Sequence, residues 1–254
     1  MITQDPKEIE NLRAGGKILA TVLDLVAKAA KPGVSAFDLD QLAESEIIKR
    51  GGKPSFKNYA SQPGDPPFPA SLCVSVNDEV VHGIPTKNKI LKDGDIVGLD
   101  LGVLYEGLYT DAAITIPVGK VSEKKLKLIQ AATESLNAGL AQVKAGVFTG
   151  DIGNAIESVV KKYEFQVVRE LVGHGVGKAV HEDPEVPNFG RTKTGTKLVK
   201  GLVIAVEPMV NEGTWKVYFA PDNWTVKTLD KGWSAHMEHT ILVTDKGCEI
   251  LTSL

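Results

Sequence analysis

The sequence predicts an α+β fold in which two similar halves, about residues 1–120 and 121–254, face each other across a pseudo-twofold axis. The first sign is a repeat: residues 31–39 (KPGVSAFDL) match residues 144–152 (KAGVFTGDI), and both segments join two helix-like patterns. The second sign is that β-prone segments bearing two acidic residues follow the helices in each half. The nine-residue match taken alone is also compatible with two unrelated helix joints of similar sequence.

Length and composition indicate a single domain in a reducing compartment. The 254 residues are enough for one domain (1–254) with a sizeable core. The formal net charge is −3 and no long run of Lys or Arg occurs, so nucleic acid is not an expected partner. No apolar segment reaches membrane length, and the polar start lacks the features of a signal peptide. With only Cys73 and Cys248, no disulfide framework is expected, and a cytoplasmic location follows.

The first half predicts two helices, a loop and a strand that ends at a histidine. Apolar residues recur at helical spacing over about residues 6–31 and 36–50. Residues 53–70 are rich in Pro, Gly and small polar residues and predict a long loop, which is typical of a segment that lines a site. Residues 71–81 then predict a strand that leads to His82.

Residues 95–116 (DIVGLDLGVLYEGLYTDAAITI) predict a β-hairpin that carries two aspartates. Two β-prone runs flank Glu106-Gly107, a pair that suits a tight turn. With this turn, residues whose numbers sum to 213 face each other, and Asp100 and Asp111 project from the same face as diagonal neighbours. A slip of the register by one residue would separate them.

The pair Asp100 and Asp111 indicates a cation. Two carboxylates about 7–8 Å apart on an apolar face repel each other and are costly to bury. A divalent metal ion removes this cost, because it binds deprotonated oxygen ligands. A single aspartate in a strand is more often exposed to water, whereas the pair on one face favours a metal site.

The second half repeats the order of the first. Helices are predicted to begin near residues 122 and 149, and extended chain with glycine turns covers 166–190. Two strand candidates follow, and each bears a glutamate: residues 201–210 with Glu207 and residues 235–243 with Glu238. Two similar halves would therefore point four carboxylates at one centre.

All five histidines lie beside these features: His82, His174, His181, His236 and His239. Glycines 173, 175 and 177 surround His174 and remove side chains, so that backbone can come close to a ligand or an ion. His174 and His181 are an odd number of positions apart, which places them on opposite faces of a regular strand. A bulge or a turn is required if both reach one site.

Four carboxylates with one or two imidazoles make a hard, oxygen-rich ligand set without the cysteines of a structural zinc site. This set favours Mn, Fe or Co, with Zn as a further option. Two of the acids can each bridge, so two divalent ions about 3.5–4 Å apart are expected, which can activate water and polarise a carbonyl. The predicted reaction class is metal-assisted hydrolysis.

These residues resemble a known family. Asp100 and Asp111, residues 173–184 (GHGVGKAVHEDP), the Glu207-Pro208 strand and Glu238 within MEHT are similar to the type I methionine aminopeptidases. The likeness covers nearly the whole chain. It implies a pita-bread fold, in which a pseudo-twofold pair of αβ halves surrounds a curved antiparallel sheet.

The resemblance implies a dinuclear metal site. Asp100 would bind one ion, and His174 and Glu207 would bind the second. Asp111 and Glu238 would bridge the two ions. Glu207 would also act in catalysis, as the group that takes a proton from water and passes it to the leaving amine.

The resemblance also implies a substrate pocket. His82 and His181 would contact the substrate and take part in catalysis. The wall of the pocket would include three further side chains, each of which could equally belong to ordinary core: Phe68, Cys73 and Trp224. Leu171, Val180 and the stretch 63–67 with Asp65 depart from the usual family pattern, which leaves the shape of the methionine pocket open.

The implied activity is that of a methionyl aminopeptidase, a metallohydrolase that removes the N-terminal methionine from nascent proteins and peptides when the second residue is small and uncharged. Its partners would be N-termini of nascent polypeptides, with neither a membrane nor a specific nucleic acid. A cytoplasmic monomer is expected, and contact with the ribosome surface is left open.

Three other interpretations are weaker. Proline-directed peptidases share the fold and the ligands, but they generally carry an added N-terminal domain, and only about 80 residues precede His82. The type II branch carries a long insertion, for which the step from Glu207 to Glu238 leaves little room. A non-catalytic binding module on this scaffold would be expected to lose ligands, and all five are present.

Overall fold

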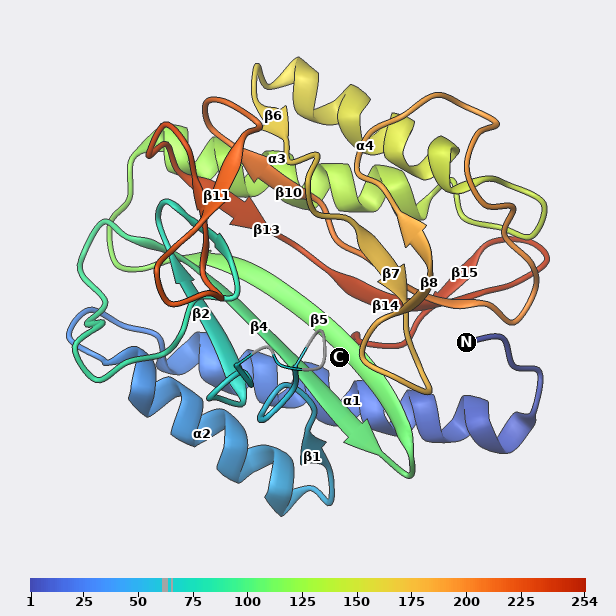
Figure 1. Cartoon of the computed structure of the whole chain (residues 1–254), viewed down its shortest axis with the longest axis horizontal. Coiled ribbons are helices and arrows are strands. Elements are labelled where there is room, and N and C mark those ends of the chain that lie inside the picture. Colours follow the sequence, from blue (N-terminus) through green and yellow to red (C-terminus); the bar gives the residue numbers. More distant parts are fainter. Residues whose placement is uncertain (61–63, 65) are drawn as a thin grey trace.

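The computed structural model describes residues 1–60, 64 and 66–254, and Figure 1 shows their arrangement. The first helix pair, α1 (Pro6–Ala29) and α2 (Ala36–Lys49), lies along one edge of the molecule. The second pair, α3 (Glu123–Leu140) and α4 (Thr149–Lys162), lies along the opposite edge. In this view the strands lie between the two pairs, and all their pairings in the described chain are antiparallel.

The strands of the first half are β1 (Lys53–Pro54), β2 (Leu72–Val76), β3 (Glu79–Val81), β4 (Ile96–Tyr105) and β5 (Leu108–Pro117). β4 pairs with β1, β2 and β5. The strand predicted over 71–81 is in fact two strands, because the chain turns at Asn77, whose φ is +56°. β2 stays with β4, whereas β3 joins a separate sheet with β12 (Val226–Thr228) and β11 (Val217–Phe219).

The hairpin of β4 and β5 has the predicted register. Tyr105 pairs with Leu108 and Gly102 with Asp111, so paired residue numbers sum to 213. Glu106 and Gly107 both have positive φ angles, as the tight hairpin turn requires. Asp100 and Asp111 are therefore diagonal neighbours on one face, as the sequence predicted.

The second half adds two further sheets. One contains β6 (Gln166–Val167), β10 (Met209–Asn211) and β13 (Ser234–His236). The other contains β7 (Gly173–Gly175), β8 (Glu182–Val186), β9 (Val203–Val206), β14 (His239–Val243) and β15 (Cys248–Ile250). Each of the two predicted glutamate-bearing strands is interrupted, because the chain leaves one sheet and enters the other at 207–208 and again at 237–238. Pro208 has no N–H to donate, which suits this break.

The internal repeat is structural. In the first half, Gly33 N donates to Leu91 O, and Leu91 N donates to Val34 O. In the second half, Gly146 N donates to Leu198 O, and Leu198 N donates to Val147 O. Both helix joints are thus held by the same pair of backbone hydrogen bonds to a leucine. The two matched segments occupy equivalent places, which supports two related halves over two unrelated joints.

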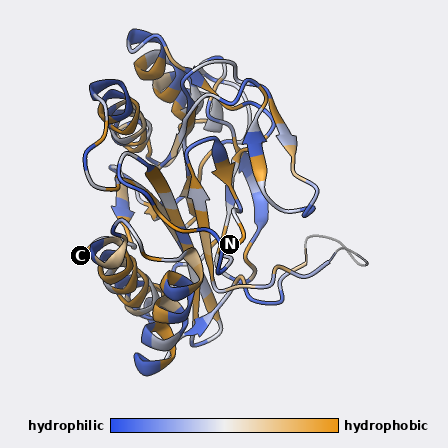
Figure 2. Ribbon diagram, turned by 90° about the vertical axis from the view of Figure 1, so that its left-hand side faces the viewer, coloured by the Kyte–Doolittle hydropathy of each residue, from blue (hydrophilic) through white to orange (hydrophobic). Residues whose placement is uncertain are grey.

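Each half has its own apolar core between its helices and strands. One cluster joins α1 and α2 to β2, β4 and β5, and another joins α3 and α4 to β9, β10, β13 and β14. Figure 2 shows that both helix pairs lie to one side of the strands. Within the described residues, none of the helices combines the length and apolarity that crossing a membrane demands.

Candidate metal centre and substrate pocket

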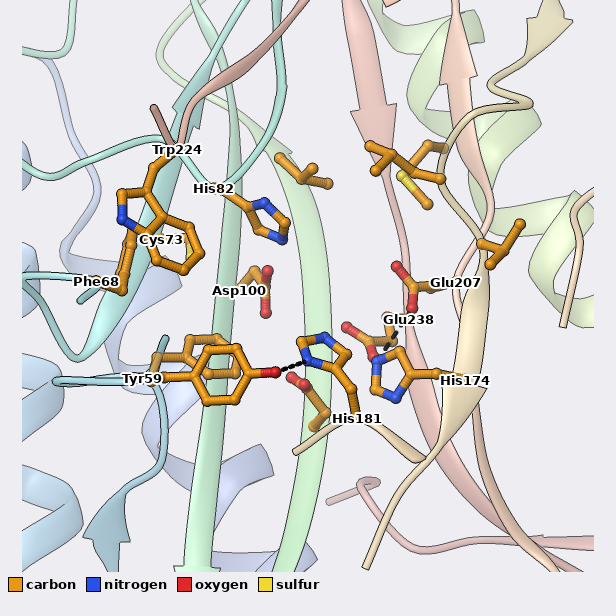
Figure 3. A pocket seen from close by; sticks show the side chains of 16 residues that line it. Tyr59, Phe68, Cys73, His82, Asp100, His174, His181, Glu207, Trp224 and Glu238 are labelled. Atoms are coloured by element: carbon orange, nitrogen blue, oxygen red, sulfur yellow. Dashed lines mark hydrogen bonds and ion pairs between the residues drawn. The ribbon is translucent and has the colours of Figure 1, made fainter. Parts of the chain in front are cut away.

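One cavity is lined by strands and loops of both halves, and all ten residues that the sequence predicted for the site line it (Figure 3). They are His82, Asp100, Asp111, His174, His181, Glu207, Glu238, Phe68, Cys73 and Trp224. Six further residues complete the wall: Phe56, Tyr59, Val81, Leu171, Val172 and Met209. Apart from Leu171, the sequence had not singled these out.

The four carboxylates come from four separate strand segments. Asp100 lies on β4 and Asp111 on β5, while Glu207 follows β9 and Glu238 precedes β14. The first two belong to one half of the chain and the last two to the other. The four predicted acids therefore meet only where the halves meet.

Hydrogen bonds between the halves hold these segments together at the site. The hydroxyl of Thr240 accepts from Asp111 N at 2.8 Å and donates to Asp111 O at 2.7 Å. Nearby, Glu238 N donates to Ala113 O at 2.9 Å. Because these bonds involve the backbone of Asp111 and Glu238 themselves, they set the separation of the two side chains directly.

His174 and His181 meet through a turn, as their odd spacing required. His174 lies on β7, the chain reverses over residues 176–181, and β8 returns antiparallel to β7 with Glu182 opposite Gly175. The two imidazole rings lie 4.3 Å apart between centroids. Both therefore reach the cavity from one short hairpin.

Glycines 173 and 175 allow protein backbone, rather than a ligand, to approach β7. A Cβ atom at Gly175 would lie 2.1 Å from Asp183 O, and one at Gly173 would lie 2.5 Å from Ala205 O. The close contacts bring β8 and β9 against β7. The glycines thus place His174 by strand packing.

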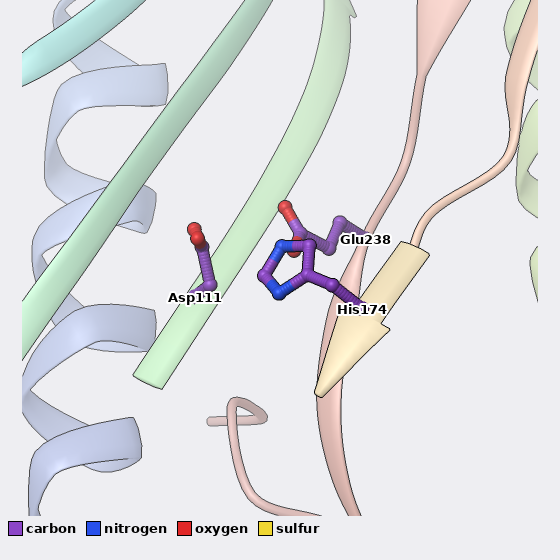
Figure 4. A group of neighbouring side chains, drawn as sticks. All are labelled: Asp111, His174 and Glu238. Atoms are coloured by element: carbon purple, nitrogen blue, oxygen red, sulfur yellow. The ribbon is translucent and has the colours of Figure 1, made fainter. Parts of the chain in front are cut away.

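Asp111, His174 and Glu238 offer ligand atoms that all lie within 4.8 Å of one another (Figure 4). Glu207 adjoins this group, with its Oε1 3.4 Å from His174 Nε2. Figure 3 shows Asp100 on the neighbouring strand, facing the same cavity. The cluster is compact enough for metal binding, and its oxygen-rich composition suits hard divalent ions.

Burial makes three of the four carboxylates unstable as free anions. Each of the four is at most 8% exposed. Burial, and then neighbouring carboxylates, raise the pKa values of Asp111 and Glu238 well above their usual range, and burial raises the pKa of Asp100 to about 7. One oxygen each of Asp100, Asp111 and Glu238 lacks a hydrogen-bond partner among the described residues. Buried, unpaired oxygens of this kind fit a site that binds cations.

Glu207 differs from the other three because imidazoles surround it. Burial alone would raise its pKa, but the neighbouring His236 and His174 outweigh burial and lower the pKa below its usual value. His236 Nε2 lies 3.6 Å from Glu207 and 4.0 Å from Glu238. The sequence placed His236 near the site without a role, and only the clustering of histidines signalled it.

The environment of His82 and His181 favours the neutral imidazole. Burial lowers the pKa of His82 to about 4, and burial followed by the proximity of His174 lowers the pKa of His181 to about 3. His82 has a φ angle of +57° and follows β3 directly. As uncharged imidazoles, both can donate one hydrogen bond from a ring N–H.

The apolar side of the cavity is built around Trp224. Its ring packs edge-on against Phe68, 5.3 Å between centroids, and its Nε1 donates to Pro66 O at 3.0 Å. Burial raises the pKa of the Cys73 thiol well above its usual value, with Asp100 next in effect, so this residue is an uncharged wall group. Val180 is buried in one apolar cluster with Phe68 and Cys73, against which Trp224 packs. Asp65, whose effect on the pocket the sequence left open, lies outside the described residues.

This fold and this carboxylate-rich centre define a metal-dependent peptidase. The sequence pattern of metallopeptidase family M24 matches residues 10–245, so the chain belongs to that family and uses a divalent metal ion. Its relatives include a methionine aminopeptidase of Clostridium acetobutylicum, 46% identical over 252 residues that cover 99% of this chain and 98% of that protein. Methionine aminopeptidase 1 of Bacillus subtilis is 45% identical over 252 residues, 99% of each chain. The resemblance predicted from the sequence is confirmed.

Solved structures show the same fold. The crystal structure of a methionine aminopeptidase from Thermotoga maritima matches with a TM-score of 0.95 and 44% identity over 100% of both chains. This match confirms the predicted pita-bread fold. A prolidase from Pyrococcus furiosus shares the fold alone, with a TM-score of 0.79 and 22% identity, and this chain covers 66% of it.

The raised pKa of Asp100 predicts a pH-dependent cost in metal-free protein. The pKa of Asp100 rises from an ordinary value near 3.8 to about 7 in the folded protein. Its contribution to the free energy of unfolding therefore falls as the pH rises from the first value through the second. The lowered pKa values of His82 and His181 act in the opposite direction. Comparing an Asp100 variant with the parent at each pH cancels the contribution of the histidines and isolates that of Asp100.

We expect Asp100→Asn, without metal, to gain stability relative to the parent as the pH rises from 4.5 to 7.5. Urea unfolding in EDTA at several pH values measures this. Adding Mn²⁺ at pH 7.5 should stabilise the parent more than the variant. A stability difference that stays constant across this pH range would show that Asp100 carries no such cost.

Proposed function

We propose that this chain hydrolyses the peptide bond after an N-terminal methionine when the second residue is small and uncharged. The observation that carries the proposal is a single cavity with a buried carboxylate and imidazole centre on one side and an apolar aromatic wall on the other (Figure 3). The centre suits the free amine and the scissile carbonyl, and the wall suits a thioether beside aromatic rings. The methionine aminopeptidases among its relatives support the same conclusion.

Five residues are proposed to hold two divalent ions. Asp100 would bind one ion, His174 and Glu207 the other, and Asp111 and Glu238 would bridge both. The shared oxygen-rich set favours Mn, Fe or Co, with Zn as a further option. Ions bound there lower the pKa of water and polarise the scissile carbonyl.

The protein's own groups then handle protons and orientation. The carboxylate of Glu207, kept ionised by its neighbouring imidazoles, accepts a proton from the attacking water. It returns that proton to the amine nitrogen of the second residue as the C–N bond breaks. His181 donates a hydrogen bond to the carbonyl oxygen, where negative charge develops, and His82 orients the substrate. The products are free methionine and the shortened polypeptide.

The setting of the reaction is part of the proposal. Both halves line the cavity, so residues 1–254 would act as one catalytic domain. One chain supplies all the named site residues, which supports a monomer. N-termini of nascent polypeptides in the cytoplasm are the proposed substrates. A proline-directed peptidase is the alternative, favoured only by the shared fold of the prolidases.

Peptide turnover tests the specificity. Metal-free protein supplied with Mn²⁺, Fe²⁺ or Co²⁺ should release methionine from Met-Ala-Ser at least about tenfold faster than it cleaves Ala-Pro-Ala, since an apolar pocket discriminates by about 10–200-fold. Substituting Met-Leu-Ser should slow release because the second residue is large. Preference for the Ala-Pro bond would move the assignment to the proline-directed class.

Neutralising either proposed bridge should abolish the reaction. Asp111→Asn or Glu238→Gln would leave two cations repelling each other across one remaining bridge. Turnover should therefore fall more than about 100-fold, which exceeds the loss usually seen when a residue that only hydrogen-bonds to a metal ligand is changed. The matched control is Asp24→Asn on α1, a half-buried carboxylate that pairs with Lys28 and does not line the cavity, and this change should leave turnover unchanged. Full Mn²⁺-dependent turnover in either bridge variant would contradict the two-ion arrangement.

His174 and His181 should separate into two roles. In His181→Ala, bound metal should stay near the parent level while turnover falls about 10²–10³-fold, because a donor to the developing charge is lost. In His174→Ala, one metal site should weaken directly. Calorimetric titration of Mn²⁺ into both proteins, with turnover measured alongside, distinguishes the roles. Equal loss of metal in both, or unchanged turnover in His181→Ala, would refute the division.

A further inference from the structure

Tyr59 contacts His181 from the other half of the chain. The tyrosine hydroxyl lies 2.7 Å from His181 Nδ1, across 122 residues of sequence. The two rings are 5.3 Å apart between centroids and tilted by 56°. Figure 3 shows the hydroxyl meeting the near edge of the imidazole, with the other ring nitrogen turned away into the cavity.

The position of Tyr59 is built into the loop between β1 and β2. Tyr59 N donates to Phe56 O at 2.9 Å, and Phe68 N donates to Tyr59 O at 2.7 Å. The ring of Tyr59 packs on the apolar cluster that contains Phe56, Phe68 and Val180. The tyrosine is thus held beside the substrate wall by backbone bonds on both sides.

His181 is confined on its other face by His174, whose ring lies 4.3 Å away at an angle of 66°. A neutral imidazole carries one proton, either on Nδ1 or on Nε2, and a hydroxyl that donates to Nδ1 leaves the ring proton on Nε2. Only a ring with its proton on Nε2 can donate a hydrogen bond into the cavity.

We propose that Tyr59 is a positioning residue that donates its hydroxyl proton to Nδ1 of His181 and so keeps the ring proton on Nε2, facing the scissile carbonyl. This inference rests on the proposed function, in which His181 is a donor to that carbonyl. Tyr59 touches the imidazole and stabilises it in the donor form. The proton on Nε2 is shared with the carbonyl oxygen as negative charge develops there and is not transferred.

The test is Tyr59→Phe, which removes one oxygen and keeps the ring. We expect kcat for Met-Ala-Ser with Mn²⁺ to fall about 2- to 13-fold, the range that one hydrogen bond provides, with KM little changed. The matched control is Tyr163→Phe at the end of α4, which removes a hydroxyl that hydrogen-bonds Glu134 of α3. That variant should keep the parent kcat.

A tautomer measurement distinguishes positioning from a general structural role. In full-length protein labelled with ¹⁵N-histidine and loaded with diamagnetic Zn²⁺, His181 of the parent and of Tyr163→Phe should carry its proton on Nε2. Tyr59→Phe should show a mixture of tautomers. Zn²⁺ affinity measured by calorimetry should be equal in all three proteins.

Three results would overturn the role of Tyr59: a parent with the proton on Nδ1, a Tyr59→Phe protein with unchanged tautomer and kcat, or a loss of Zn²⁺ affinity that accounts for the lower kcat. These outcomes leave the proposed function standing if His181→Ala still loses turnover. If His181→Ala retains full turnover, the donor role of His181 fails instead, whatever the variant at position 59 shows.

Discussion

The structure depends on one electrostatic constraint, the need to neutralise four carboxylates that are buried around one point. In a buried site without cations, the pKa values of Asp100, Asp111 and Glu238 are raised above their ordinary range. Glu207 is the exception, because imidazoles lie beside it. A fold that tolerates such a cluster must fix the carboxylates closely enough for divalent ions to replace the protons. The hydrogen bonds from Thr240 to Asp111 and from Glu238 to Ala113 supply that rigidity.

The neutral imidazoles follow from the same burial. Burial lowers the pKa values of His82 and His181 to about 4 and about 3, which favours neutral imidazoles that can form hydrogen bonds. Chemistry that needs a charged acceptor is left to Glu207, the carboxylate whose pKa is lowered. The proposed division of roles, with one carboxylate for proton transfer and two imidazoles for orientation, thus follows from the surroundings of each group, since all three are buried.

Local patterns were enough to predict the helices and the register of the β4–β5 hairpin, because a tight turn and alternating side chains determine which residues pair. They also predicted the internal repeat. They could not predict the interruptions at Glu207 and Glu238, since leaving one sheet for another is decided by partners far away in the sequence. Tyr59 was missed for a similar reason, because its contact with His181 depends on how a long irregular loop folds over the cavity. For His181 itself, spacing showed that a turn was necessary but not where it lay.

The origin of the four carboxylates in two different halves has a consequence for the order of folding. A chain in which only the first half has formed carries Asp100 and Asp111 as a repelling pair, and a chain with only the second half formed carries Glu207 and Glu238. Neither half alone supplies all of the proposed ligands, so metal binding by the full set would require the two cores to have docked. An ion held by ligands from both halves would stabilise the docked arrangement over any state in which one half has folded without the other.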